Sequence, residues 1–116
     1  MFPLSAATRI YLAAGATDLR KSFEGLSDLV TQGFQQDPLS GHLFLFVNRR
    51  KNRLKVLYCD GTGVWVCAKR LGRGTFAWPP PTTPGAVQIL AAELTLLLNG
   101  IDLNRTQPRT WWRRAE

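Results

Sequence analysis

A tight hairpin near the middle of the chain limits the possible folds more than any other segment. Two runs of strand-forming residues, 54–59 and 64–68, flank the sequence Asp60-Gly61-Thr62-Gly63. An Asp-Gly pair between two such runs is typical of a turn that joins antiparallel strands. The simplest register pairs Cys59 with Val64 and fixes every other pair of the two strands. It also places Cys59 and Cys67 on opposite faces of the sheet, as free thiols.

The predicted register gathers positive charge at the open end of this hairpin. It places Arg53 opposite Arg70, although like charges directly opposite each other destabilise a sheet. Residues 49–73 hold eight cations and one acid and so carry the whole net charge of +7. We call these cations the basic rim: Arg49, Arg50, Lys51, Arg53, Lys55, Lys69, Arg70 and Arg73.

Two interpretations of the basic rim remain open at this point. A solvated protein surface normally mixes charges of both signs, whereas this one is almost entirely positive. A polyanion such as DNA would offset the repulsion, and the rim is therefore our candidate nucleic-acid site. The alternative is a rim that only contacts water.

Arg20 and Lys21 form a second candidate anion site. The sequence predicts that they lie in the first turn of a helix, where the macrodipole disfavours cations and attracts anions. The alternative is that both side chains point into water or pair with Glu24.

The end of the chain offers a third candidate site. Residues 103–116 are predicted to form a basic tail without helical or strand periodicity. Its Trp111-Trp112-Arg113-Arg114 run combines aromatic rings with guanidinium groups, which suits stacking on bases or anchoring in a partner's pocket. Folding of the tail back onto the core is the alternative.

The remaining periodicities predict an α+β fold over one domain, residues 1–102. We expect a small twisted antiparallel sheet, with the option of curling into a partial barrel, packed against two helices. Thr17 or Asp18 would cap the first helix, and Thr83, with Pro84 next to it, the second. Besides the hairpin, the predicted elements are strands at 9–15, 43–47 and 76–78 and helices at 19–34 and 87–101.

The residues that carry chemistry are few and scattered. Two cysteines and the single histidine, His42, are too few for a structural zinc site. No cluster of carboxylates suggests a metal-dependent nuclease, and no nucleophile stands beside a base. We therefore expect no catalytic residues, no metal and no cofactor. The absence of a leader or a membrane-spanning stretch favours the cytoplasm.

Several ordered motifs resemble a known family. They include the run from Tyr11 to Leu26, the Asp37-Pro38-Leu39-Ser40-Gly41-His42 segment, the hairpin with its flanking cations, and the Asn99-Gly100-Ile101-Asp102 stop. Together they resemble the TnpB accessory protein of bacterial insertion sequences of the IS-sixty-six type, which is distinct from the RNA-guided nuclease of the same name. Gly72 and Thr75 depart from the family pattern, which often has glutamate and arginine there.

The resemblance implies a role in transposition beside a larger protein that carries the catalytic acids. It transfers no catalytic residue to this chain. Our leading hypothesis is a non-catalytic accessory factor that binds DNA, or a complex of transposase and DNA, through the basic rim. The alternative is a protein–protein adaptor that docks on the transposase without contacting DNA.

Overall fold

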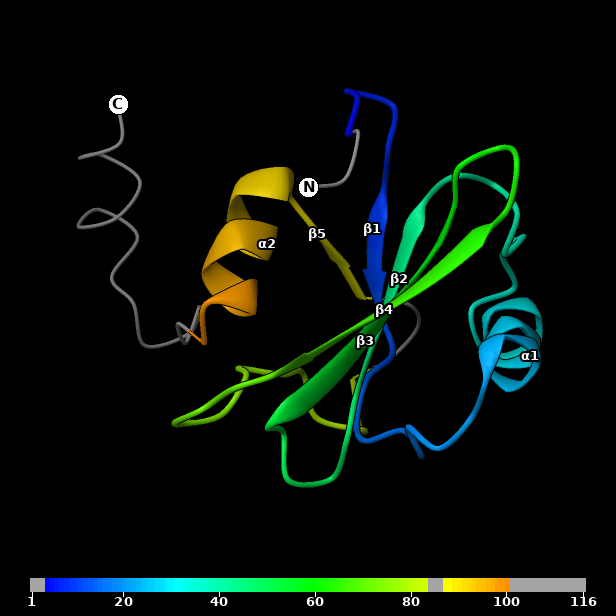
Figure 1. Cartoon of the computed structure of the whole chain (residues 1–116). Helices are drawn as coiled ribbons and strands as arrows, with labels where there is room; N and C mark the ends of the chain where they lie inside the picture. Colours follow the sequence, from blue (N-terminus) through cyan, green and yellow to red (C-terminus); the bar gives the residue numbers. More distant parts are fainter. Residues whose placement is uncertain (1–3, 84–86, 101–116) are drawn as a thin grey trace.

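The apolar run Leu43–Val47 forms β2, the middle strand of a five-stranded sheet (Figure 1). The computed structural model describes residues 4–83 and 87–100. All five side chains of β2 are buried, as a strand covered on both faces requires. The strand order is β4-β3-β2-β1-β5. The other strands are β1 (Ile10–Leu12), β3 (Arg53–Cys59), β4 (Val64–Arg70) and β5 (Val87–Ile89).

The two described helices cover opposite faces of this sheet (Figure 1). On one face Leu26 and Val30 of the first helix pack against aromatic side chains of β2. On the other face Leu94 and Leu97 of the second helix close the larger core. Neither helix has the length and apolar character needed to cross a membrane. The helices are α1 (Phe23–Gly33) and α2 (Ala91–Leu98).

The predicted α+β class is confirmed, and the sheet is open rather than closed into a barrel. In the described ranges the pairings β1–β5, β2–β3 and β3–β4 are antiparallel as expected. The β1–β2 pairing is parallel, which makes the sheet mixed. The reason is the connection: α1 lies between these two strands and returns the chain to the same end of the sheet.

The predicted hairpin register is confirmed pair by pair. Cys59 pairs with Val64, and Arg53 stands opposite Arg70. The turn is held by Asp60, whose carboxylate accepts hydrogen bonds from the Thr62 and Gly63 backbone and, at 2.8 Å, from the indole N–H of Trp65. Both cysteines are free and half-buried.

Asp60 makes hairpin stability depend on pH. The hydrogen bond from the Trp65 indole, followed by those from Thr62 and Gly63, holds the pKa of the Asp60 carboxyl well below its usual 3.8. A lowered pKa in the folded state stabilises the protein above the unfolded pKa of about 3.9, and this contribution is lost as the pH falls toward the folded value. We predict that Asp60→Ala lowers the Tm at pH 7 and that the difference from the parent shrinks below about pH 4.

Thermal melts at a series of pH values measure this effect. Asp28→Ala, which removes an exposed acid on α1, is the matched control and should leave the Tm nearly unchanged. A constant gap between Asp60→Ala and the parent from pH 7 to low pH would show that the carboxylate charge plays no part.

The first helix begins four residues later than predicted. Its N-cap is Ser22, which makes no side-chain cap hydrogen bond, so neither Thr17 nor Asp18 caps the helix. Asp18 instead forms a separate turn, in which its carbonyl oxygen accepts a hydrogen bond from the Lys21 backbone at 3.2 Å. A single aspartate can close a turn or cap a helix, and here the turn prevails.

The second helix is also shorter than predicted, because its expected first turn is a strand. Val87–Ile89 is β5, which pairs with β1 at the edge of the sheet. The helix starts after Leu90, whose N–H donates to the Glu93 carboxylate at 2.8 Å. The proposed cap at Thr83 is therefore wrong, and Pro84 lies outside the described residues.

The predicted strand at 76–78 is wrong as well, although the segment is part of the core. Phe76 and Trp78 are buried outside any strand, with exposed fractions of 1% and 7%. The indole N–H of Trp78 donates to the Ala13 carbonyl at 2.7 Å, and the Phe76 N–H donates to the Lys51 carbonyl at 2.7 Å. These two hydrogen bonds hold residues 76–78 against the sheet, although the segment is not a strand.

Candidate nucleic-acid interface

The candidate site lies on the part of the sheet that α1 leaves uncovered. On β3, Arg53 and Lys55 alternate with the buried Leu54 and Val56, and they face the same side of the sheet as α1. Arg70 of β4 stands beside Arg53 on this side. Since α1 packs on the other end of this face, the cationic end remains accessible.

Residues 16–20 form one wall of the site. Beyond β1 the chain continues along β2, and the Ala13 N–H donates to the Leu45 carbonyl and the Thr17 N–H to the Val47 carbonyl. Gly15 permits this path: its φ is +74°, and a Cβ there would lie 2.8 Å from Pro81. The parallel extension brings Arg20 to the same end of the sheet as the basic rim.

The turn that follows β2 closes one end of the site with Asn48, Arg49 and Arg50, and Asn48 fixes its shape. The Asn48 side-chain oxygen accepts hydrogen bonds from the Asn52 and Arg53 backbone at 3.1 and 3.0 Å. The Leu71 N–H donates to the Asn52 carbonyl at 2.9 Å. As the sequence predicted, antiparallel pairing therefore places this turn beside the loop after β4.

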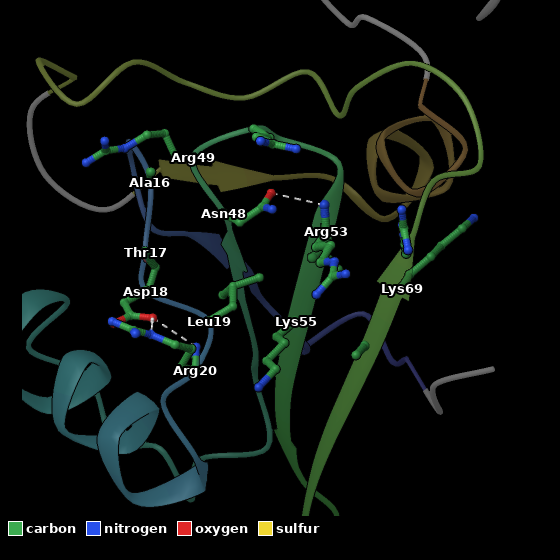
Figure 2. A pocket seen from close by; sticks show the side chains of 14 residues that line it. Ala16, Thr17, Asp18, Leu19, Arg20, Asn48, Arg49, Arg53, Lys55 and Lys69 are labelled. Carbon is green, nitrogen blue, oxygen red and sulfur yellow. Dashed lines mark hydrogen bonds and ion pairs between the residues drawn. The ribbon is translucent and has the colours of Figure 1, made fainter.

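These segments enclose a hollow of about 900 Å³ (Figure 2). Seven cations and one acid line it. We call it the basic hollow, lined by Ala16, Thr17, Asp18, Leu19, Arg20, Asn48, Arg49, Arg50, Arg53, Leu54, Lys55, Ala68, Lys69 and Arg70. A concave, mostly positive surface of this kind focuses its field on an anionic ligand.

The one carboxylate of the basic hollow is engaged by Arg20. The Arg20 guanidinium contacts both oxygens of Asp18, at 3.0 and 2.8 Å, and forms an exposed ion pair. The hydrogen bond from the Arg20 side chain lowers the pKa of Asp18 from 3.8 to about 2. Arg20 therefore precedes the helix, so its predicted place in the first turn of α1 is wrong. Its side chain is 92% exposed, as the alternative expected, and pairs with Asp18 rather than with Glu24. Lys21 also precedes the helix and is exposed.

The cations of the basic rim fall into two groups, those that line the hollow and those that do not. Arg49 and Arg50, on the turn, and Arg53 and Arg70, on the strands, line the hollow without any acid partner among the described residues. The Lys55 ammonium also lies in the hollow and donates to the Lys21 carbonyl at 3.3 Å. Lys51 and Arg73 are exposed but do not line it.

Lys69 lines the hollow but directs its ammonium to the other face of the sheet. The ammonium donates to the Leu98 carbonyl at 2.7 Å, at the C-terminal end of α2, and Figure 2 shows the side chain pointing away from Asp18 and Arg20. A cation at a helix C-terminus stabilises the helix by about 0.3–1 kcal/mol. Lys69 therefore stabilises the fold.

We predict different consequences for Lys69 and Lys55. Lys69→Met should reduce the free energy of unfolding by about 0.5–1 kcal/mol, through loss of the contact with α2, and change DNA affinity little. Urea unfolding and a DNA-binding titration on the same sample separate the two effects. Lys55→Met is the control, with the larger loss of affinity expected there. A larger affinity loss in Lys69→Met would move the binding surface to the α2 face.

The possible metal ligands of the described residues lie apart from one another. No three His, Cys, Asp or Glu side chains among them come together as a metal-binding group. The His42 Nδ1 accepts a hydrogen bond from the Arg9 N–H at 2.9 Å, which fixes this ring at the start of β2. The Trp111, Trp112, Arg113 and Arg114 anchor lies outside the described residues, so that site and the boundary at residue 102 stay predictions.

Comparison with known proteins agrees with the motif pattern. The family model described as IS66 Orf2 like protein matches residues 8–108. This chain belongs to the IS66 Orf2-like family. The match includes all described strands and helices and the whole basic hollow.

Two curated relatives share most of their length with this IS66 Orf2-like chain. Both come from Sinorhizobium fredii and are named only as uncharacterized proteins. Protein y4hO is 40% identical over 111 residues, covering 96% of this chain and 95% of its own. Protein y4jC is 35% identical over 103 residues, covering 89% and 87%. No solved structure matches at a significant level.

Membership of the IS66 Orf2-like family indicates an accessory role related to transposition of an insertion sequence. No catalytic activity is known for the family, and its members are associated with an IS66 transposition system. The family therefore gives the process, and the chemistry of the site must indicate the ligand.

Proposed function

We propose that this protein is a non-catalytic accessory factor in transposition that binds DNA through the basic hollow. The observation that carries the proposal is the pairing of Arg53 with Arg70 beside Arg49 and Arg50 in one concavity. The only acid in that concavity is already bound to Arg20. Phosphate groups of a nucleic acid would offset the repulsion between these cations.

The shape of the site favours contacts with the backbone of DNA over reading of its bases. The cations come from strands and turns, and neither described helix contributes a residue to the hollow, whereas base reading in the major groove commonly uses a helix. Arginine guanidinium groups suit the geometry of phosphate oxygens. We therefore propose that binding depends weakly on base sequence. Its role would be to position the transposase and the element DNA relative to each other. This would occur in the cytoplasm.

Salt dependence of binding to a random DNA duplex tests the proposal. We expect the logarithm of the affinity to fall linearly with the logarithm of salt concentration, with a slope of about −0.9 for each phosphate neutralised. The same titration with purified transposase of the element tests the alternative. A protein that binds transposase at moderate salt and leaves duplex DNA free would be an adaptor.

A further inference from the structure

The edge strand β4 presents an unpaired backbone to solvent. It is seven residues long and ends the described sheet, whereas the opposite edge, β5, has three residues. A long, accessible edge is a template for pairing with another strand. Two of its apolar side chains are exposed, Trp65 at 56% and Val66 at 36%.

The hydrogen bonds at the two ends of the hairpin determine which groups face outward. The Asp60 N–H donates to Gly63 at one end, and the Leu71 N–H donates to Asn52 at the other. Hydrogen-bonded pairs alternate along an antiparallel ladder, so Cys67 directs its backbone groups toward β3. The residues that direct N–H and C=O groups outward are therefore Val64, Val66, Ala68 and Arg70.

We propose that a second copy of this chain pairs with β4 antiparallel, about a two-fold axis at Cys67. Cys67 is the middle residue of Val64–Arg70, so only an axis at this residue pairs all seven residues of one copy with the seven of the other. Each Val66 then exchanges hydrogen bonds with Ala68 of the partner subunit. All outward-facing backbone groups of β4 find partners.

The distribution of charge along β4 favours this orientation. Both cations of the strand, Lys69 and Arg70, are at one end, while the other end holds Trp65 bonded to the Asp60 carboxylate. Antiparallel pairing about Cys67 separates the two cationic ends by the length of the strand. Lys69 then lies opposite Trp65 of the partner subunit, and a parallel arrangement would instead place like charges together.

The pairing has a consequence for the basic hollow. Both copies of Cys67 lie on one face of the joined sheet, so the axis is perpendicular to that sheet and the two copies present the same face on the same side. The two hollows, which include Arg70 and Ala68, lie on the opposite face from Cys67 and thus also face the same way. One continuous ligand could then contact both copies.

Sedimentation equilibrium over a concentration series, together with oxidative cross-linking, tests the dimer. Opposite residues at a non-hydrogen-bonded position have Cα atoms about 4.5 Å apart, within the range that a disulfide bridges. We expect copper-phenanthroline to link the parent and Cys59→Ser as dimers and to leave Cys67→Ser unlinked. A monomer at every concentration, or a dimer linked through Cys59 alone, would overturn the proposal.

A proline variant tests the backbone pairing itself. Ala68→Pro removes an outward N–H and none that bonds β3, so the domain should fold but remain monomeric. Ala91→Pro, at the first position of α2 where proline is tolerated, is the control and should remain dimeric. A dimer that persists in folded Ala68→Pro contradicts the proposal. If that variant does not fold, the comparison of Cys67→Ser with Cys59→Ser decides.

Discussion

Replacing Arg50, Arg53 and Arg70 together by glutamine should flatten the salt dependence of duplex binding by about 2.7 in the log–log slope. All three residues line the basic hollow, and none has an acid partner among the described residues. Three lost phosphate contacts release three fewer counterions. Affinity at low salt should fall by about tenfold or more, across all DNA sequences alike. Stability should change little or rise, because Arg53 and Arg70 no longer repel each other.

A second triple variant distinguishes the hollow from net charge alone. Arg9, Lys51 and Arg73 are exposed cations that do not line the hollow, and their replacement by glutamine removes the same charge. Its salt slope should remain close to that of the parent. Equal losses in the two triple variants would mean that only the overall charge attracts DNA.

Phe76→Ala should have the largest effect on stability, lowering the free energy of unfolding by about 3–5 kcal/mol. Phe76 is 1% exposed and packs in the core cluster on the α2 face, although it belongs to no strand. Its N–H bonds the Lys51 carbonyl, so the core contact also holds the loop after β4 against the turn at 48–52. Urea unfolding measures the loss: the midpoint should fall while the m-value stays unchanged, which indicates a change in stability alone.

Phe23→Ala is the matched control for this core substitution. Phe23 is 40% exposed at the start of α1, and its removal should cost less than about 1 kcal/mol. Comparable losses at Phe76 and Phe23 would show that the 71–78 segment contributes no more to the core than a surface position does.

The parts of the fold that depend on neighbouring residues could be predicted from the sequence. Asp60 and Gly61 determine the turn, the turn determines the register, and the register places Arg53 opposite Arg70. The burial of β2 followed from its uninterrupted apolar run. These inferences need only local turn chemistry and the two-residue period of a strand.

The parts that depend on distant pairing could not. Val87–Ile89 fits a helical stripe as well as a strand, and only its pairing with β1 decides between them. The alternation Val-Gln-Ile, followed by Leu90 and by Glu93 three residues later, is the signal that could have indicated a strand and then a capped helix.

The sequence did not place Arg20 with the basic rim, because their proximity also depends on pairing between distant strands. Its place in the hollow follows from the parallel pairing of β1 with β2, which is formed across a connection that contains α1. The early turn at Asp18 then keeps Arg20 out of the helix and beside the cations of β3. Local sequence motifs carry no information on this long-range pairing, so they do not join the two sites.

Residue-resolved NMR titration of the protein with a short random duplex tests the central claim most directly. We predict that the backbone amides that shift are those of the hollow, around Arg20, Asn48, Arg53 and Arg70, and that the shifts weaken as salt is added. Shifts confined to α2 and β5, on the opposite face and edge of the sheet, or no shifts at low salt, would contradict it.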